Sequence, residues 1–183
     1  MVRRIWFVVI SVGLAASVSC AQPADDSKSL QGRLYLELGT GIDVPVWGND
    51  IIQQEYKAAV GYYFDENQAA QLKVVSSFSN SNGISLTETK IIPEVKLLEY
   101  PDVVRPYVLL GAGVVNFTYS PDSLYPNTGT LSFWYFDVVF GGGVDAPLDG
   151  ETSLFIEAKF NQIYVPDQIT RDIPITAGMN FNL

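Results

Sequence analysis

The segment Ile173-Pro174-Ile175-Thr176-Ala177-Gly178-Met179-Asn180-Phe181-Asn182-Leu183 alternates in character from one residue to the next. Its odd-numbered positions are apolar, and its even-numbered positions are small or polar. Successive side chains of a β-strand point to opposite faces, so this period of two predicts a strand with one apolar face. The segment also has about the 9–11 residues that a tilted strand needs to cross a bilayer.

The same alternation recurs along the chain, without any long segment of helical periodicity. Eight runs are predicted as strands: residues 33–42, 55–64, 68–79, 86–98, 105–119, 131–145, 152–164 and 173–183. Short connections at 65–67, 101–102 and 147–150 alternate with longer ones at 43–50, 80–85, 120–130 and 166–172. Long strands joined in this way are typical of membrane barrels. The sequence therefore predicts an all-β fold, an eight-stranded antiparallel up-and-down transmembrane β-barrel.

In most runs one face carries only lipid-compatible side chains, and the other carries the charges. Hydrocarbon does not solvate charge, so the charged face is predicted to line the lumen, where side chains fill so narrow a barrel. The predicted lumen charge network is Glu37, Lys57, Lys73, Glu88, Lys90, Glu94, Lys96, Asp137, Glu157 and Lys159. Asp137 is the expected partner of Lys159. The alternation does not decide whether Gly111 and Gly113 lie on the lumen face or on the lipid face.

A soluble, lipocalin-like barrel is the alternative to this facing. It would bury the apolar faces and expose the charged ones. Several aromatic side chains stand near the ends of the apolar faces, among them Tyr56, Tyr62, Phe64 and Trp134. Aromatic girdles of this kind lie at the headgroup level of a membrane, so the transmembrane interpretation is favoured.

The N-terminal segment has the pattern of an export signal. Arg3 and Arg4 precede an apolar run, and small residues follow through Ala21. Cleavage after Ala21 predicts a signal peptide at 1–21, a flexible periplasmic leader at 22–32 and a barrel domain at 33–183. Lipidation at Cys20 is the alternative processing route. Cys20 is the only cysteine, so no disulfide is expected.

Composition excludes several classes of function. Loss of Arg3 and Arg4 with the signal would leave nine basic and twenty acidic groups, a net charge of −11, which disfavours nucleic acid as a partner. The chain contains no histidine, so histidine-based catalysis and histidine-ligated metals are excluded. The acidic residues predicted in loops do not repeat a calcium-loop spacing, and no cofactor or metal is expected. Those residues are Asp43, Asp50, Asp122 and Asp167.

Two stretches resemble a known group of proteins. Residues 105–115, beginning Arg105-Pro106-Tyr107, and the hairpin from Phe140 to Phe160 are similar to glycine-rich strands of the small outer-membrane β-barrel superfamily, which includes OmpA-like, OmpX-like and OmpW-like barrels. The resemblance implies residence in a Gram-negative type of outer membrane and a monomer in contact with lipids and lipopolysaccharide. It also implies delivery to the barrel assembly machinery through the C-terminal strand.

Three functional classes follow. The first is a barrel with a side-chain-plugged lumen and a structural or surface-interaction role. The second, implied by the OmpW-like resemblance, is a narrow passive channel for small or apolar molecules. The third is a lipid-modifying enzyme, for which no catalytic constellation is visible. Ten ionisable side chains in so small a bore leave little room for water, so the plugged barrel is favoured and no enzymatic activity is expected.

Overall fold

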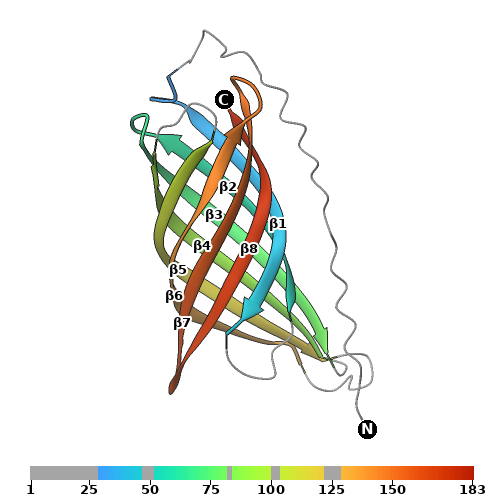
Figure 1. Cartoon of the computed structure of the whole chain (residues 1–183). Coiled ribbons are helices and arrows are strands. Elements are labelled where there is room, and N and C mark those ends of the chain that lie inside the picture. Colours follow the sequence, from blue (N-terminus) through green and yellow to red (C-terminus); the bar gives the residue numbers. More distant parts are fainter. Residues whose placement is uncertain (1–28, 47–51, 82–83, 100–103, 122–128) are drawn as a thin grey trace.

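The computed structural model describes residues 29–46, 52–81, 84–99, 104–121 and 129–183. Its strands are β1 (Leu34–Pro45), β2 (Gln53–Tyr63), β3 (Gln68–Ser81), β4 (Ile84–Leu98), β5 (Arg105–Pro121), β6 (Leu131–Pro147), β7 (Thr152–Val165) and β8 (Gln168–Asn182). Each strand pairs antiparallel with the next, and β8 pairs with β1 to close a barrel of tilted strands (Figure 1). The predicted fold class is confirmed. None of the described residues forms a helix long and apolar enough to cross a membrane.

Most strands extend further than the sequence predicts, and β8 and β1 extend furthest. β8 begins at Gln168 instead of residue 173, and β1 continues to Pro45 because Pro45 lies opposite Asp172 in the β1–β8 register. The predicted loop at 166–172 is therefore only a tight turn. Asp167 in this turn has a φ of 66°, a left-handed conformation that aspartate tolerates better than most residues. As a consequence, Asp43 and Asp172 are strand residues and not loop residues.

The outer face of the barrel is apolar, and the inner face carries the charges. Leu110 is 64% exposed and Phe140 is 54% exposed, whereas Glu37 and Asp137 are 0% exposed. The facing predicted for the first, second, sixth and seventh runs is confirmed, and the lipocalin-like alternative is wrong. An apolar exterior of this extent on a barrel without strand edges is the arrangement that a bilayer requires.

Glycines let bulky side chains lie flat inside the barrel. The Tyr35 ring covers Gly61 so closely that a Cβ at that glycine would overlap it. At Gly143 a Cβ would stand 2.7 Å from the Tyr107 hydroxyl oxygen. Gly111 and Gly113 belong to the lumen-facing set of β5, in phase with buried Tyr107 and Val115. Their facing is thus decided by the structure.

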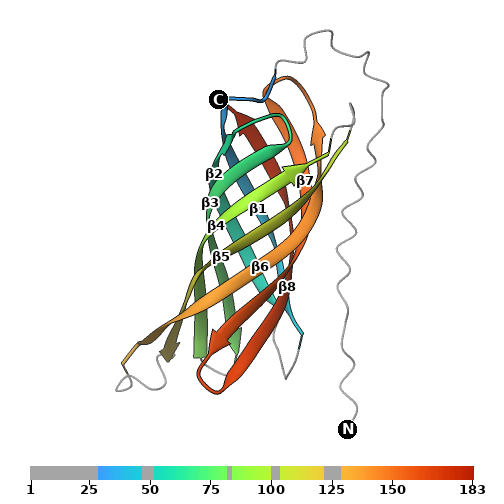
Figure 2. The ribbon, with the colours of Figure 1, turned by 90° about the vertical axis from the view of Figure 1, so that its left-hand side faces the viewer.

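The two ends of the barrel differ. At the turn end, β2–β3 and β6–β7 are joined by short turns, and the Leu183 N–H donates to the Leu34 carbonyl at 2.8 Å (Figure 2). The β6–β7 turn is held by Asp149, whose carboxylate accepts the N–H groups of Glu151 and Thr152 at 2.8 and 2.5 Å. These hydrogen bonds keep the pKa of Asp149 below its usual value. The opposite end, where β1–β2 and β5–β6 are connected, is called the loop end.

Candidate functional site

All ten residues of the predicted lumen charge network are buried inside the barrel. They do not form one continuous group. Seven of them lie in mid-barrel and form what we call the central network: Glu37, Lys57, Lys73, Glu94, Lys96, Glu157 and Lys159. The other three, Glu88, Lys90 and Asp137, lie nearer the loop end. The interior is therefore built in separate levels.

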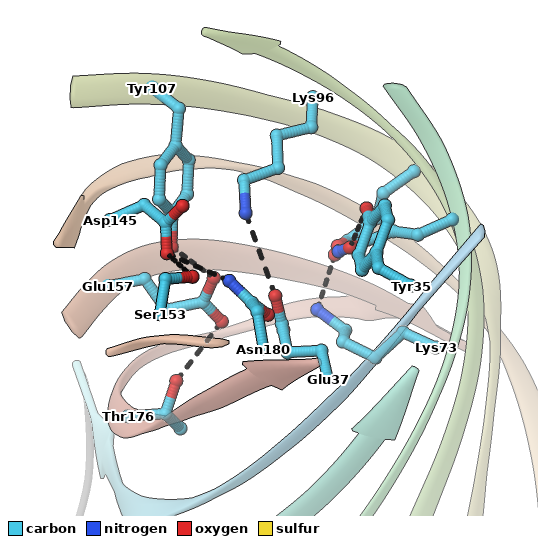
Figure 3. A network of polar contacts seen from close by, with 12 residues as sticks. Tyr35, Glu37, Lys73, Lys96, Tyr107, Asp145, Ser153, Glu157, Thr176 and Asn180 are labelled. Carbon is cyan, nitrogen blue, oxygen red and sulfur yellow. Dashed lines mark hydrogen bonds and ion pairs between the residues drawn. The ribbon is translucent and has the colours of Figure 1, made fainter. Parts of the chain in front are cut away.

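Glu157 on β7 is the hub of the central network. Its Oε1 atom pairs with Lys57 of β2 and lies 2.5 Å from the Lys159 Nζ atom. Its Oε2 atom accepts the Tyr107 hydroxyl at 3.2 Å, and its Oε1 atom also accepts the Thr176 hydroxyl at 3.1 Å (Figure 3). Several charge-assisted contacts of this kind are what a carboxylate needs to stay ionised away from water.

Glu94 on β4 is a second acceptor. It pairs with Lys73 of β3, and its Oε1 atom lies 3.8 Å from the Lys159 Nζ atom. The Gln71 amide donates to its Oε2 atom at 2.6 Å, and the Tyr35 hydroxyl donates to Gln71 at 2.7 Å. Lys159 thereby links the Glu94 and Glu157 groups, and the chain of contacts spans the bore.

Lys96 is held differently from the other lysines. Its Nζ atom has no hydrogen-bond partner among the described residues, and it lies 3.7 Å from a Glu37 oxygen. It also lies 3.9 Å from the centroid of the Tyr107 ring. An ammonium over an aromatic face is attracted by the ring quadrupole, and the attraction is stronger where water is excluded. Glu37 in turn binds Lys57 at 2.6 Å.

An apolar cluster closes the turn end beneath this network. We call it the apolar base, and it consists of Leu30, Tyr35, Tyr63, Ala69, Leu98, Tyr107 and Leu109. Leu30 belongs to the predicted leader, yet it is only 4% exposed. A turn holds it there: the Arg33 N–H donates to the Leu30 carbonyl at 3.1 Å, and the Gly32 N–H donates to the Tyr63 carbonyl at 2.9 Å. The end of the leader is thus part of the apolar base, and residues 1–28 lie outside the described residues.

A second charged group lies toward the loop end, and we call it the mouth cluster. Lys90 of β4 is surrounded by Asp43 of β1, Glu88 of β4 and Asp172 of β8, at 3.4, 2.8 and 2.7 Å from its Nζ atom. Asp137 of β6 completes the cluster through its electrostatic interaction with Lys90, Asp172 and Glu88. One ammonium therefore contacts three carboxylates.

The expected pair between Asp137 and Lys159 is not formed. Lys159 is bound by Glu157 and Glu94, while Asp137 lies opposite Ile163 in the β6–β7 register and belongs to the mouth cluster. The expectation used proximity along the hairpin, but strand tilt moves neighbouring residues to different levels. Lys159 instead pairs within its own strand with Glu157 and across the lumen with Glu94.

Sequence reasoning also missed buried polar residues that complete the interior. Asp43 and Asp172 were expected in loops. Asp145 accepts the Ser153 hydroxyl at 2.6 Å and the Asn180 amide at 2.9 Å, forming a third polar group near the turn end (Figure 3). If the alternation of inward and outward side chains had been continued to the ends of the strands, Asp43, Asp145 and Asp172 would have been predicted on the lumen face. No similar signal identifies Tyr107 as the residue that joins the apolar base to Glu157.

Comparison with known proteins supports the fold alone. No protein-family model matches the chain, and no curated protein matches its sequence. Among solved structures, Neisserial surface protein A aligns with a TM-score of 0.70 at 10% identity, over 81% of this chain and 96% of that protein. Ail, the attachment invasion locus protein of Yersinia pestis, aligns with a TM-score of 0.54 at 14% identity, over 82% of this chain and 99% of that protein. The outer membrane protein OprG from Pseudomonas aeruginosa aligns with a TM-score of 0.52 at 12% identity, over 87% of this chain and 99% of that protein. The chain thus has the fold of small eight-stranded outer-membrane β-barrels of the Gram-negative type.

Proposed function

We propose that the protein is an integral outer-membrane barrel with a side-chain-plugged lumen and a structural or surface-interaction role. The apolar exterior and the likeness in fold to outer-membrane proteins support the location. Outer-membrane lipids and lipopolysaccharide would contact the exterior, and the barrel assembly machinery would receive the chain through β8. A closed barrel leaves no strand edge for self-pairing, which supports a monomer.

One observation supports the proposal that side chains plug the lumen. The central network and the apolar base occupy successive levels of the same bore, and Tyr107 belongs to the base while also binding Glu157. An ion crossing the barrel would have to separate lysine–glutamate pairs and then pass a level packed with the side chains of the apolar base. Both steps are costly away from water.

The names of two proteins of similar fold favour an interaction role. Two of the similar structures belong to a protein named a surface protein and to one named for attachment and invasion. The interior contains no histidine, and its buried serine–aspartate pair, Ser153 with Asp145, lacks the third group that would activate a nucleophile. We therefore propose binding and not catalysis.

Planar-bilayer recording of the refolded protein tests the plug. The parent barrel is expected to give no current steps once insertion has been verified by its folded mobility on unheated gels. Tyr107→Ala removes a ring from the apolar base and a donor from Glu157, and it is expected to create conductance. Tyr119→Ala is the matched control, because this tyrosine lies on the same strand at the loop end. Regular steps in the parent would support the narrow passive channel instead.

A further inference from the structure

The mouth cluster forms the floor of a cavity at the loop end. The cavity has a volume of about 420 Å³. Asp43, Glu88 and Asp172 contribute to its lining, and Phe117, Tyr119 and Tyr135 are aromatic lining residues. A solute at the loop end could reach these carboxylates without crossing the central network.

Three carboxylates converge on this floor from strands far apart in the sequence. One oxygen of Asp43, one of Glu88 and one of Asp172 lie within 4.8 Å of one another. The three residues are 2%, 2% and 5% exposed. This spacing allows a single cation to contact all three oxygens.

The cluster also holds oxygens that no donor satisfies. Asp137 is 0% exposed, and neither of its carboxylate oxygens has a hydrogen-bond partner among the described residues. The same is true of Oδ1 in Asp43 and Oδ1 in Asp172. The Asn161 amide oxygen is also unsatisfied, and Asn161 lies opposite Asp172 in the β7–β8 register. Buried acceptors without donors are rare in proteins and indicate a missing partner.

Lys90 neutralises only part of this charge. Its single ammonium contacts the carboxylates of Asp43, Glu88 and Asp172, and Arg171, which also lines the cavity, adds a second positive charge; with all five groups ionised, one negative charge is in excess. The donors are carboxylate and amide oxygens, the ligands that hard divalent cations prefer. Calcium fits better than magnesium, because calcium accepts irregular sets of oxygens whereas magnesium demands near-octahedral geometry.

We propose that the acidic floor of the loop-end cavity binds a hard divalent cation of the calcium type, with Asp43, Glu88 and Asp172 as its carboxylate ligands. Lys90 then acts as a tethered competitor that occupies the same carboxylates when the cation is absent. This site is separate from the central network, and its occupancy does not depend on whether the barrel conducts. The expectation of no metal site came from the spacing of acidic residues within loops, and such spacing does not detect ligands that come from three different strands, β1, β4 and β8.

Terbium luminescence of the full refolded protein in detergent micelles tests the site. Terbium is a calcium mimic whose emission is sensitised by nearby tyrosines, and Tyr119 and Tyr135 line the same cavity. The parent is expected to show saturable emission that excess calcium abolishes. Asp172→Asn and Asp43→Asn are each expected to weaken terbium binding about tenfold or more, as loss of groups around a metal usually does. Lys90→Met is expected to tighten binding.

Asp167→Asn is the matched control. It removes one exposed carboxylate from the turn beside β8, and asparagine tolerates the same positive φ. Its affinity for terbium is expected to equal that of the parent. Folded mobility on unheated gels is required of every variant, and Glu88→Gln replaces any that fails. Absence of saturable emission in the parent, or full affinity in both Asp172→Asn and Asp43→Asn, would overturn the proposal.

Discussion

Lys57 on β2 and Glu157 on β7 form a buried ion pair across the barrel, although 100 residues separate them in the sequence. Glu157 also binds Lys159, Tyr107 and Thr176, so the pair joins residues from β2, β5, β7 and β8. The closure of the sheet makes this contact possible, because opposite walls of so narrow a barrel lie within side-chain reach.

Loss of the Glu157 carboxylate should therefore lower the free energy of unfolding more than loss of one of the lysines that it binds. Glu157→Gln weakens the contacts with Lys57, Lys159, Tyr107 and Thr176 together, whereas Lys159→Met removes the contacts with Glu157 and Glu94 and leaves Lys57 in place beside Glu157. Breaking a buried ion pair typically costs about 3–5 kcal/mol. We expect Glu157→Gln to reach this range and Lys159→Met to cost less, as measured by urea unfolding in micelles.

The double variant Lys159→Met/Glu157→Gln checks the same interpretation. Coupled residues give non-additive effects, so its loss of stability should be smaller than the two single losses combined. Strict additivity would mean that the two side chains do not interact in the folded barrel.

The outer face of β6 should not tolerate charge. Val138 lies in the middle of this strand and points outward, so Val138→Arg is expected to cost about 2–4 kcal/mol of unfolding free energy in lipid bilayers. Asn80→Arg is the control, because Asn80 is exposed near the loop end of β3, where the expected cost is about 0–1 kcal/mol. Equal costs at the two positions would contradict the membrane level assigned to β6.

Gly61 should be needed for the packing of Tyr35. A Cβ at Gly61 would overlap the Tyr35 ring, so Gly61→Ala is expected to destabilise the barrel by about 1–3 kcal/mol, the usual cost of overpacking. Gly150→Ala serves as the control, since a Cβ there meets open space. Tyr35→Leu in the Gly61→Ala background should recover part of the loss, and a failure to recover any would exclude the ring as the cause.

Membrane residence can be examined directly in cells. The protein should fractionate with the outer membrane, and the unheated protein should migrate differently from the boiled protein on a gel, because closed barrels resist unfolding by detergent. Recovery as a soluble periplasmic monomer would contradict the proposed location.

The sequence by itself determined the barrel and its facing. A period of two needs no knowledge of neighbours, so Leu38 and Phe140 could be assigned outside and Glu37 and Asp137 inside from the alternation alone. The number of strands followed from the turn-forming residues between the runs. The strand ends were less accurate, because the hydrogen bonds that extend β1 to Pro45 are supplied by β8.

Only the tertiary structure decided which buried charges meet. Strand tilt and closure place Lys159 with Glu94 instead of Asp137, and bring Asp43, Glu88 and Asp172 to one floor. The physical reason is that alternation along a strand specifies the direction of a side chain and carries no information about its height in the barrel. That height depends on the register of every pairing around the closed sheet, which a linear pattern does not contain.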